Sequence, residues 1–121
     1  MPEGGRTIQV VDDDDDIREI LVEVLENFDH HVVTAHNGRD ALAVLRSFQV
    51  DVIVLDLTMP HMDGHGFLSA RETLNRAKNI PVLVVTASRD PAIGEDERVQ
   101  AVIRKPFSSA ELVAAIVDTL H

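Results

Sequence analysis

The sequence predicts one α/β domain built on a doubly wound, parallel sheet of five strands. Short apolar, β-branched runs alternate along its 121 residues with longer stretches of helical periodicity, which is typical of βαβ units. Two of the runs, 52–55 and 82–85, show no polar alternation, as expected of strands that are covered on both faces. Right-handed crossovers between parallel strands then place helices on both sides of the sheet.

The first half of the chain contains three predicted strands, at 7–11, 31–35 and 52–55. Apolar residues recur between them at helical spacing, in two stripes: Ile17, Ile20, Leu21, Val24, Leu25 and Phe28, and then Ala41, Leu42, Val44, Leu45 and Phe48. Either Asp14 or Asp15 is placed to cap the first of these helices, because a carboxylate can accept bonds from the free N–H groups of a first turn.

The second half repeats this pattern with strands at 82–85, ending at Thr86, and at 101–103. A third helix is expected from about 65 to 78. The last helix should begin at a capping box formed by Ser108 and Glu111. Its apolar stripe consists of Leu112, Val113, Ile116, Val117 and Leu120.

The segment 89–100 departs from the pattern. It should hold the fourth helix, yet it contains Pro91 and Gly94 and few apolar residues. Glycine in a helix interior is unfavourable, and proline is tolerated only in the first turn. We therefore expect a short or irregular fourth helix.

The overall composition excludes several classes of protein. A formal net charge of −10 makes direct binding of this segment to nucleic acid unfavourable. The chain has no cysteine, which rules out disulfides and thiolate metal sites. It also has no apolar run near the roughly 18 residues of a membrane span, so no membrane contact is expected. We expect a cytoplasmic domain at 7–121, after a flexible N-terminal tail at 1–6.

Polar residues follow the predicted strands at the point where each strand ends. Asp12 and Asp13 follow the first, Asp56 the third, Thr86 ends the fourth and Lys105 follows the fifth. Because the carboxyl ends of parallel strands meet at one edge of a sheet, these side chains should converge, although they are far apart in the sequence.

Three carboxylates brought together in this way would repel one another. A hard cation such as Mg²⁺ resolves the repulsion, because it prefers oxygen ligands and keeps several waters that an incoming phosphoryl oxygen can replace. Lys105 would add a second positive charge, and the hydroxyl of Thr86 would add a hydrogen-bond donor. This combination suits phosphoryl transfer.

Each piece also has an ordinary interpretation. The run 12–16 alone would suit a solvated acidic turn, and Asp56 alone a turn after a strand. A calcium loop is a further alternative, but Ile17 stands where such a loop requires glycine. The joint occurrence of acids, Thr86 and Lys105 at successive strand ends favours a functional site.

Four motifs in this order resemble those of the receiver domains of bacterial two-component response regulators. They are VVDD at 10–13, DVIVLDLTMP at 51–60 with MDG at 62–64, VVTA at 84–87, and KPF at 105–107. The resemblance extends from about Thr7 to Leu120. It implies a flavodoxin-like fold with strand order 2-1-3-4-5.

The resemblance also implies a phosphoryl-transfer reaction. Asp56 would accept the phosphoryl group from a histidine kinase or a histidine phosphotransfer protein, or from a small acyl phosphate. Asp13, Asp56 and the backbone carbonyl of Thr58 would bind Mg²⁺, with Asp12 acting mostly through water.

In the same resemblance Lys105 would pair with the phosphoryl group, and Thr86 would swing toward it and report its presence. The bond between Lys105 and Pro106 is expected to be cis. The domain would then switch conformation and control a downstream effector domain or protein. It would be no enzyme beyond promoting its own phosphorylation and dephosphorylation.

Two departures from the family's pattern concern the switch. Many receivers carry an aromatic residue three positions before the lysine, where this chain has Val102. The stretch between Thr86 and Lys105 is also a few residues short, so output is expected to use another surface or an order–disorder change. His61, in the loop near the acids, is either a contact to metal or partner or simply exposed.

Two other functions compete with this interpretation. An aspartate-based phosphatase usually has a second acid two residues after its nucleophile, but that residue here is Thr58. A degenerate receiver that serves as a binding scaffold would be expected to lack the acceptor or the lysine, and this chain has both, but the unusual fourth-helix region keeps this alternative open.

Overall fold

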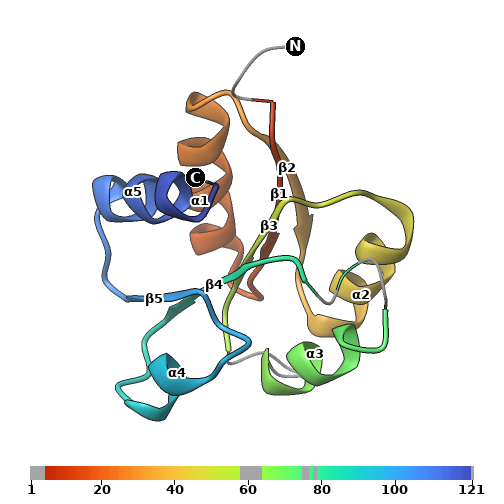
Figure 1. Cartoon of the computed structure of the whole chain (residues 1–121). Coiled ribbons are helices and arrows are strands. Elements are labelled where there is room, and N and C mark those ends of the chain that lie inside the picture. Colours follow the sequence, from red (N-terminus) through yellow and green to blue (C-terminus); the bar gives the residue numbers. More distant parts are fainter. Residues whose placement is uncertain (1–4, 58–63, 75–76, 78, 121) are drawn as a thin grey trace.

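The computed structural model describes residues 5–57, 64–74, 77 and 79–120, and in this part of the chain five strands alternate with five helices (Figure 1). The elements are β1 (Thr7–Val11), α1 (Asp15–Asn27), β2 (His31–Ala35), α2 (Gly38–Ser47), β3 (Val52–Leu55), α3 (Gly64–Arg71), β4 (Val82–Thr86), α4 (Ala92–Glu95), β5 (Ala101–Arg104) and α5 (Ser109–Leu120).

All strand pairs are parallel, and the sheet has the order β2-β1-β3-β4-β5. The predicted fold class and strand order are therefore confirmed. In Figure 1, α1 and α5 lie on one side of the sheet and α2 and α3 on the other. None of the helices in the described ranges is long and apolar enough to cross a bilayer.

Two hydrophobic clusters, one on each face, hold the helices to the sheet. Successive residues of a strand point to opposite faces. Val52 and Val54 accordingly join the cluster with residues of α1 and α5, whereas Ile53 and Leu55 join the cluster with residues of α2 and α3. This explains why β3 and β4 read as continuous apolar runs, since every residue in them is buried.

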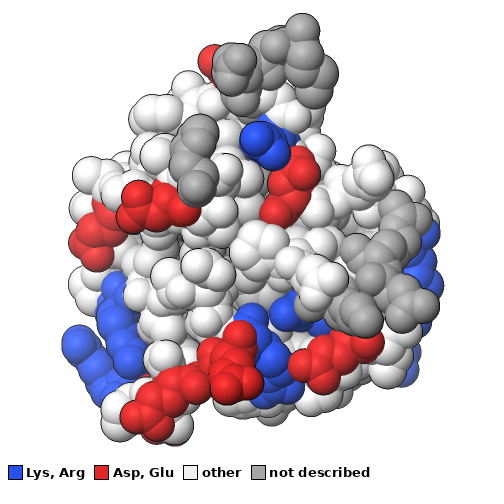
Figure 2. Space-filling view, in the orientation of Figure 1, with Lys and Arg blue, Asp and Glu red and all other residues white. Residues whose placement is uncertain are grey.

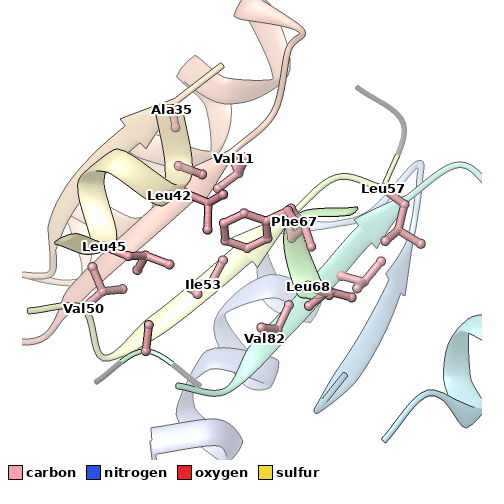
Figure 3. Packing of buried hydrophobic residues seen from close by; sticks show 14 of the residues in the cluster. Val11, Ala35, Leu42, Leu45, Val50, Ile53, Leu57, Phe67, Leu68 and Val82 are labelled. Atoms are coloured by element: carbon pink, nitrogen blue, oxygen red, sulfur yellow. The ribbon is translucent and has the colours of Figure 1, made fainter. Parts of the chain in front are cut away.

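Phe67 of α3 lies near the middle of the cluster between the sheet and helices α2 and α3 (Figure 3). Its ring points toward Leu42 of α2 and Ile53 of β3, and it is fully buried. Burial of so large a side chain fixes α3 against the sheet, beside the carboxyl end of β3.

The helix caps agree with the sequence. Asp14 caps α1 by accepting hydrogen bonds from the backbone N–H groups of Asp16 and Ile17. At the start of α5, the hydroxyl of Ser108 accepts a bond from the N–H of Glu111, and the Glu111 carboxylate accepts one from the N–H of Ser108. Both predicted caps are confirmed.

The third helix is shorter than predicted, because it ends at Arg71 rather than near residue 78. Beyond it, the backbone N–H of Leu74 bonds to the carbonyl of Arg71, and that of Ala77 bonds to the carbonyl of Leu74. The buried guanidinium of Arg71 donates to the carbonyls of Ala77 and Ile80. This side chain therefore bonds the end of α3 to the residues that precede β4.

Four apolar residues that the sequence placed in inward stripes are exposed: Ile20, Phe28, Phe48 and Val117. Phe28 is 53% exposed and Phe48 52%. Both are cap residues with non-helical backbone angles, so they leave the helical phase that predicted their direction. Ile20 and Val117 lie one position from Leu21 and Ile116, which take the inward direction.

The fourth helix is a single turn, Ala92–Glu95, as predicted. Polar contacts help to hold the chain that follows it. Arg98 donates to both carboxylate oxygens of Asp96, at 2.9 and 2.7 Å, and to the hydroxyl of Ser69 on α3. In Figure 2, acidic and basic side chains lie next to one another along the lower edge of the molecule, where Figure 1 shows α4.

The Asp96–Arg98 pair should give the domain a specific sensitivity to acid. The hydrogen bond from Arg98 lowers the pKa of Asp96 from 3.8 to about 2. Because this pKa is depressed in the folded state, the stabilisation is complete above the unfolded value and is lost as pH falls through the folded one. We expect Asp96→Asn to lower the free energy of unfolding by about 1 kcal/mol at neutral pH.

The measurement is urea unfolding of both proteins between pH 7 and pH 2. The difference in unfolding free energy should stay constant down to about pH 5 and then shrink toward zero. A difference that keeps its size at the lowest pH would show that the ion pair contributes nothing.

Candidate phosphoryl-acceptor site

Three carboxylates meet at the carboxyl edge of the sheet. Asp12, Asp13 and Asp56 each place one carboxylate oxygen so that these atoms all lie within 4.8 Å of one another. Asp12 and Asp56 are buried, at 1% and 8% exposure, whereas Asp13 is exposed. The acids are thus accessible to solvent from one side.

The parallel register of β1 and β3 produces this cluster. Val11 is paired with Leu55, so the two following residues, Asp12 and Asp56, emerge side by side. The backbone N–H of Asp56 bonds to the carbonyl of Val11 at 2.9 Å, and that of Asp12 to the carbonyl of Ala35 at 3.2 Å. Both acids therefore leave the sheet in fixed positions.

Lys105 reaches the same acids from the end of β5. Its Nζ lies 3.3 Å from Oδ2 of Asp12 and 3.9 Å from Oδ2 of Asp56. Its side chain is 20% exposed, and its peptide bond to Pro106 is cis, as expected. The ammonium group thus offsets part of the negative charge from the inner side.

Thr86 is buried at the end of β4, next to β5. Its carbonyl accepts a bond from the N–H of Lys105 at 2.8 Å. Its hydroxyl accepts a bond from the N–H of Ser88 at 3.1 Å. The structure thus brings Asp12, Asp13, Asp56 and Lys105 into direct proximity and ties Thr86 to Lys105 through the backbone.

Two residues that the sequence placed at this site, Thr58 and His61, lie outside the described residues. The ligands that remain in the described residues are carboxylate oxygens. Hard divalent cations prefer oxygen ligands to softer ligands such as sulfur. Three negative charges so close together repel one another, and the ammonium group of Lys105 offsets part of this repulsion. The arrangement fits a small cation on the exposed side of the cluster, where Asp13 lies.

The sequence did not predict a role for Arg18, whose side chain contacts the acidic segment between β1 and α1. Its guanidinium donates to the backbone carbonyl of Asp12 at 2.9 Å and to the carboxylate of Asp15. A cation near the N-terminus of a helix opposes the helix dipole unless it is paired. That unfavourable position is the signal that could have identified it.

Comparisons with known proteins agree with this geometry. A family model described as the response regulator receiver domain matches residues 8–117. The probable transcriptional regulator ycf27 of Cyanophora paradoxa is 36% identical over an alignment of 123 positions, which covers 96% of this chain and 48% of that protein. The chain spans about half the length of the curated relatives it matches.

Solved structures share the fold. The chemotaxis protein CheY4 of Vibrio cholerae is 29% identical, with a TM-score of 0.90 over 96% of this chain and 99% of that one. The receiver domain of a sensor histidine kinase of Pseudomonas aeruginosa PAO1, with a magnesium ion in its active-site cleft, is 20% identical, with a TM-score of 0.88 over 96% and 98% of the two chains. Since a family model covers most of its length, this chain belongs to the response regulator receiver domains of two-component signalling.

Proposed function

We propose that Asp56 is the phosphoryl acceptor of this receiver domain and that the transfer depends on Mg²⁺. One observation carries the proposal: the buried carboxylate of Asp56 lies within 4.8 Å of two other acids and 3.9 Å from the ammonium group of Lys105. A nucleophilic carboxylate, a cation site and a fixed positive charge are the parts that phosphoryl transfer to an acid requires.

Asp13 and Asp56 would hold the ion directly, together with the carbonyl of Thr58, and Asp12 would hold it through water. Bound there, Mg²⁺ would neutralise the charge of the phosphoryl oxygens during the transfer. Asp12 is the most deeply buried of the three acids and already bonds to Lys105 and to the N–H of Asp14, which supports its indirect role.

In the proposed reaction, one carboxylate oxygen of Asp56 attacks phosphorus and forms a P–O bond. The P–N bond of a phosphohistidine donor breaks, and its electron pair stays on the imidazole nitrogen, which then takes up a proton. With an acyl phosphate the P–O bond breaks and a carboxylate leaves. Lys105 then faces a group of roughly −1.5 to −2 charge in place of one negative charge, and Thr86 can donate to its oxygens.

The proposed partners follow from this chemistry. A histidine kinase or a histidine phosphotransfer protein would supply the phosphoryl group in the cytoplasm, and an effector domain or protein would respond to it. Curated relatives of about twice this length bear the name of transcriptional regulators, which supports an effector of that kind. The net charge of −10 argues that any DNA contact belongs to the effector. Catalysis by the domain would be limited to its own phosphorylation and dephosphorylation.

The test is incubation of the protein with acetyl phosphate and Mg²⁺, followed by measurement of the intact mass. We expect a gain of one phosphoryl group, its removal by hydroxylamine, and no gain when a chelator replaces Mg²⁺. Without any adduct the chain would be a degenerate receiver that acts as a binding scaffold. Sustained turnover of many phosphate esters would instead indicate a phosphatase.

A further inference from the structure

Arg104 ties the loop that follows Thr86 to the edge strand of the sheet. It lies on β5 directly opposite Thr86 in the parallel register. Its guanidinium donates to the backbone carbonyl of Ser88 and, at 3.4 Å, to that of Asp90. One side chain thus holds two carbonyls of the loop between β4 and α4.

The same loop is bonded to the hydroxyl of Thr86. Oγ1 of Thr86 accepts a hydrogen bond from the N–H of Ser88 at 3.1 Å. The hydroxyl of Ser88 accepts one from the N–H of Asp90, and the carboxylate of Asp90 accepts one from the N–H of Ala92, the first residue of α4. A continuous series of bonds therefore runs from Thr86 to α4.

Ser88 is consequently held at both ends, by Thr86 at its N–H and by Arg104 at its carbonyl. A rotation of Thr86 toward a phosphoryl group would carry its oxygen away from the N–H of Ser88. Either that N–H then loses its acceptor, or the backbone of Ser88 follows and the bonds to Arg104 break. Each alternative sacrifices a hydrogen bond of the resting structure.

We propose that Arg104 is a positioning residue that holds the backbone of Ser88 and Asp90 in the resting position and so opposes the movement of Thr86 toward a phosphoryl group. The inference rests on the proposed function, because it concerns the response to the group on Asp56. Val102 on the same strand has no ring that could follow Thr86. The guanidinium of Arg104 instead forms a polar link between β5 and the loop.

Removal of the side chain should therefore favour the phosphorylated conformation. With alanine at 104, Ser88 can follow Thr86 without breaking a bond to β5, and a ligand that requires this movement binds more tightly. We expect Arg104→Ala to raise the apparent affinity for beryllofluoride, a mimic of the phosphoryl group, about tenfold in the presence of Mg²⁺. Arg89→Ala, at an exposed arginine of the same loop, should leave it unchanged.

A thermodynamic cycle separates this role from a merely structural one. In a Thr86→Ala background, Arg104→Ala should no longer change the affinity, because its effect passes through Thr86. Beryllofluoride binding is measured by ¹⁹F NMR or calorimetry on five proteins. They are the wild type, the single variants Arg104→Ala, Arg89→Ala and Thr86→Ala, and the double variant with alanine at 86 and 104. If Arg104→Ala does not fold, Arg104→Lys replaces it, since one ammonium group holds the two carbonyls less well than a guanidinium fork.

The outcomes are distinct. If the wild type does not bind beryllofluoride, the proposed function fails and the inference fails with it. If the wild type binds but Arg104→Ala binds equally well or more weakly, the proposed function stands and the inference is overturned. A tenfold gain that persists without the Thr86 hydroxyl would also overturn it.

Discussion

Replacement of Asp56 by asparagine should abolish the phosphoryl adduct completely while leaving the fold intact. The amide has nearly the shape of the carboxylate but lacks the anionic oxygen that attacks phosphorus. It also removes one of the charges that attract the cation, so the affinity for Mg²⁺ should fall by roughly tenfold or more. Intact mass after incubation with acetyl phosphate measures the first effect, and a Mg²⁺ titration the second.

Stability provides the first check on this result. Asp56 is repelled by two neighbouring acids and attracted by Lys105, so its neutralisation should leave the free energy of unfolding unchanged or raise it by at most about 1 kcal/mol. Asp51→Asn is the matched control at the opposite end of β3, where an amide oxygen can still accept the bond from Thr7. An adduct of normal yield on Asp56→Asn would contradict the assignment of the acceptor.

Lys105→Ala should slow formation of the adduct by roughly 10²- to 10³-fold. Its ammonium group lies 3.9 Å from the proposed acceptor, where it can stabilise the charge of the phosphoryl oxygens, and loss of such a preorganised group typically has this effect. The measurement is the initial rate of adduct formation from acetyl phosphate at saturating Mg²⁺.

The same substitution should act on stability in a way that depends on the metal. Without Lys105 the buried carboxylate of Asp12 loses a charged hydrogen-bond donor. The free energy of unfolding of the metal-free domain should therefore fall by about 2 kcal/mol, which is less than the loss expected for a fully buried ion pair. Mg²⁺ should restore most of this loss, because it neutralises the same acids. Lys105→Arg keeps the charge and should show a smaller effect. A rate equal to that of the wild type for Lys105→Ala would remove the lysine from the mechanism.

The sheet and its acidic edge could be predicted because their signals are local. Continuous apolar runs mark strands covered on both faces, and the residues after those runs must lie at one edge of a parallel sheet. This reasoning predicts that Asp12, Asp56 and Lys105 lie together, and in the structure Nζ of Lys105 lies 3.3 Å from Asp12 and 3.9 Å from Asp56.

The residues that the sequence did not predict bind backbone atoms of distant segments. Gln9 is fully buried in β1, and its amide donates to the carbonyl of Ala41 in α2. Arg71 and Arg104 likewise donate to backbone carbonyls. Every residue type carries such a carbonyl, so these partners leave no mark in the sequence.

Hydrophobic periodicity also does not predict where the helices end. Phe28 and Phe48 continue the apolar spacing of α1 and α2 but lie just past the last helical residue, where the backbone turns and exposes them. The third helix ends at Arg71, whose guanidinium donates to the carbonyls of Ala77 and Ile80. Tertiary bonds decide such boundaries, and they depend on segments that the local pattern does not include.

Reduction of the phosphorylated protein with borohydride identifies which residue carries the phosphoryl group. Borohydride converts an aspartyl phosphate into homoserine, and peptide mass spectrometry then locates the altered residue. We expect homoserine at position 56 and aspartate retained at positions 12 and 13, which share the cluster. Homoserine at 12 or 13, or a phosphoryl group on a histidine or serine with Asp56 unmodified, would contradict it.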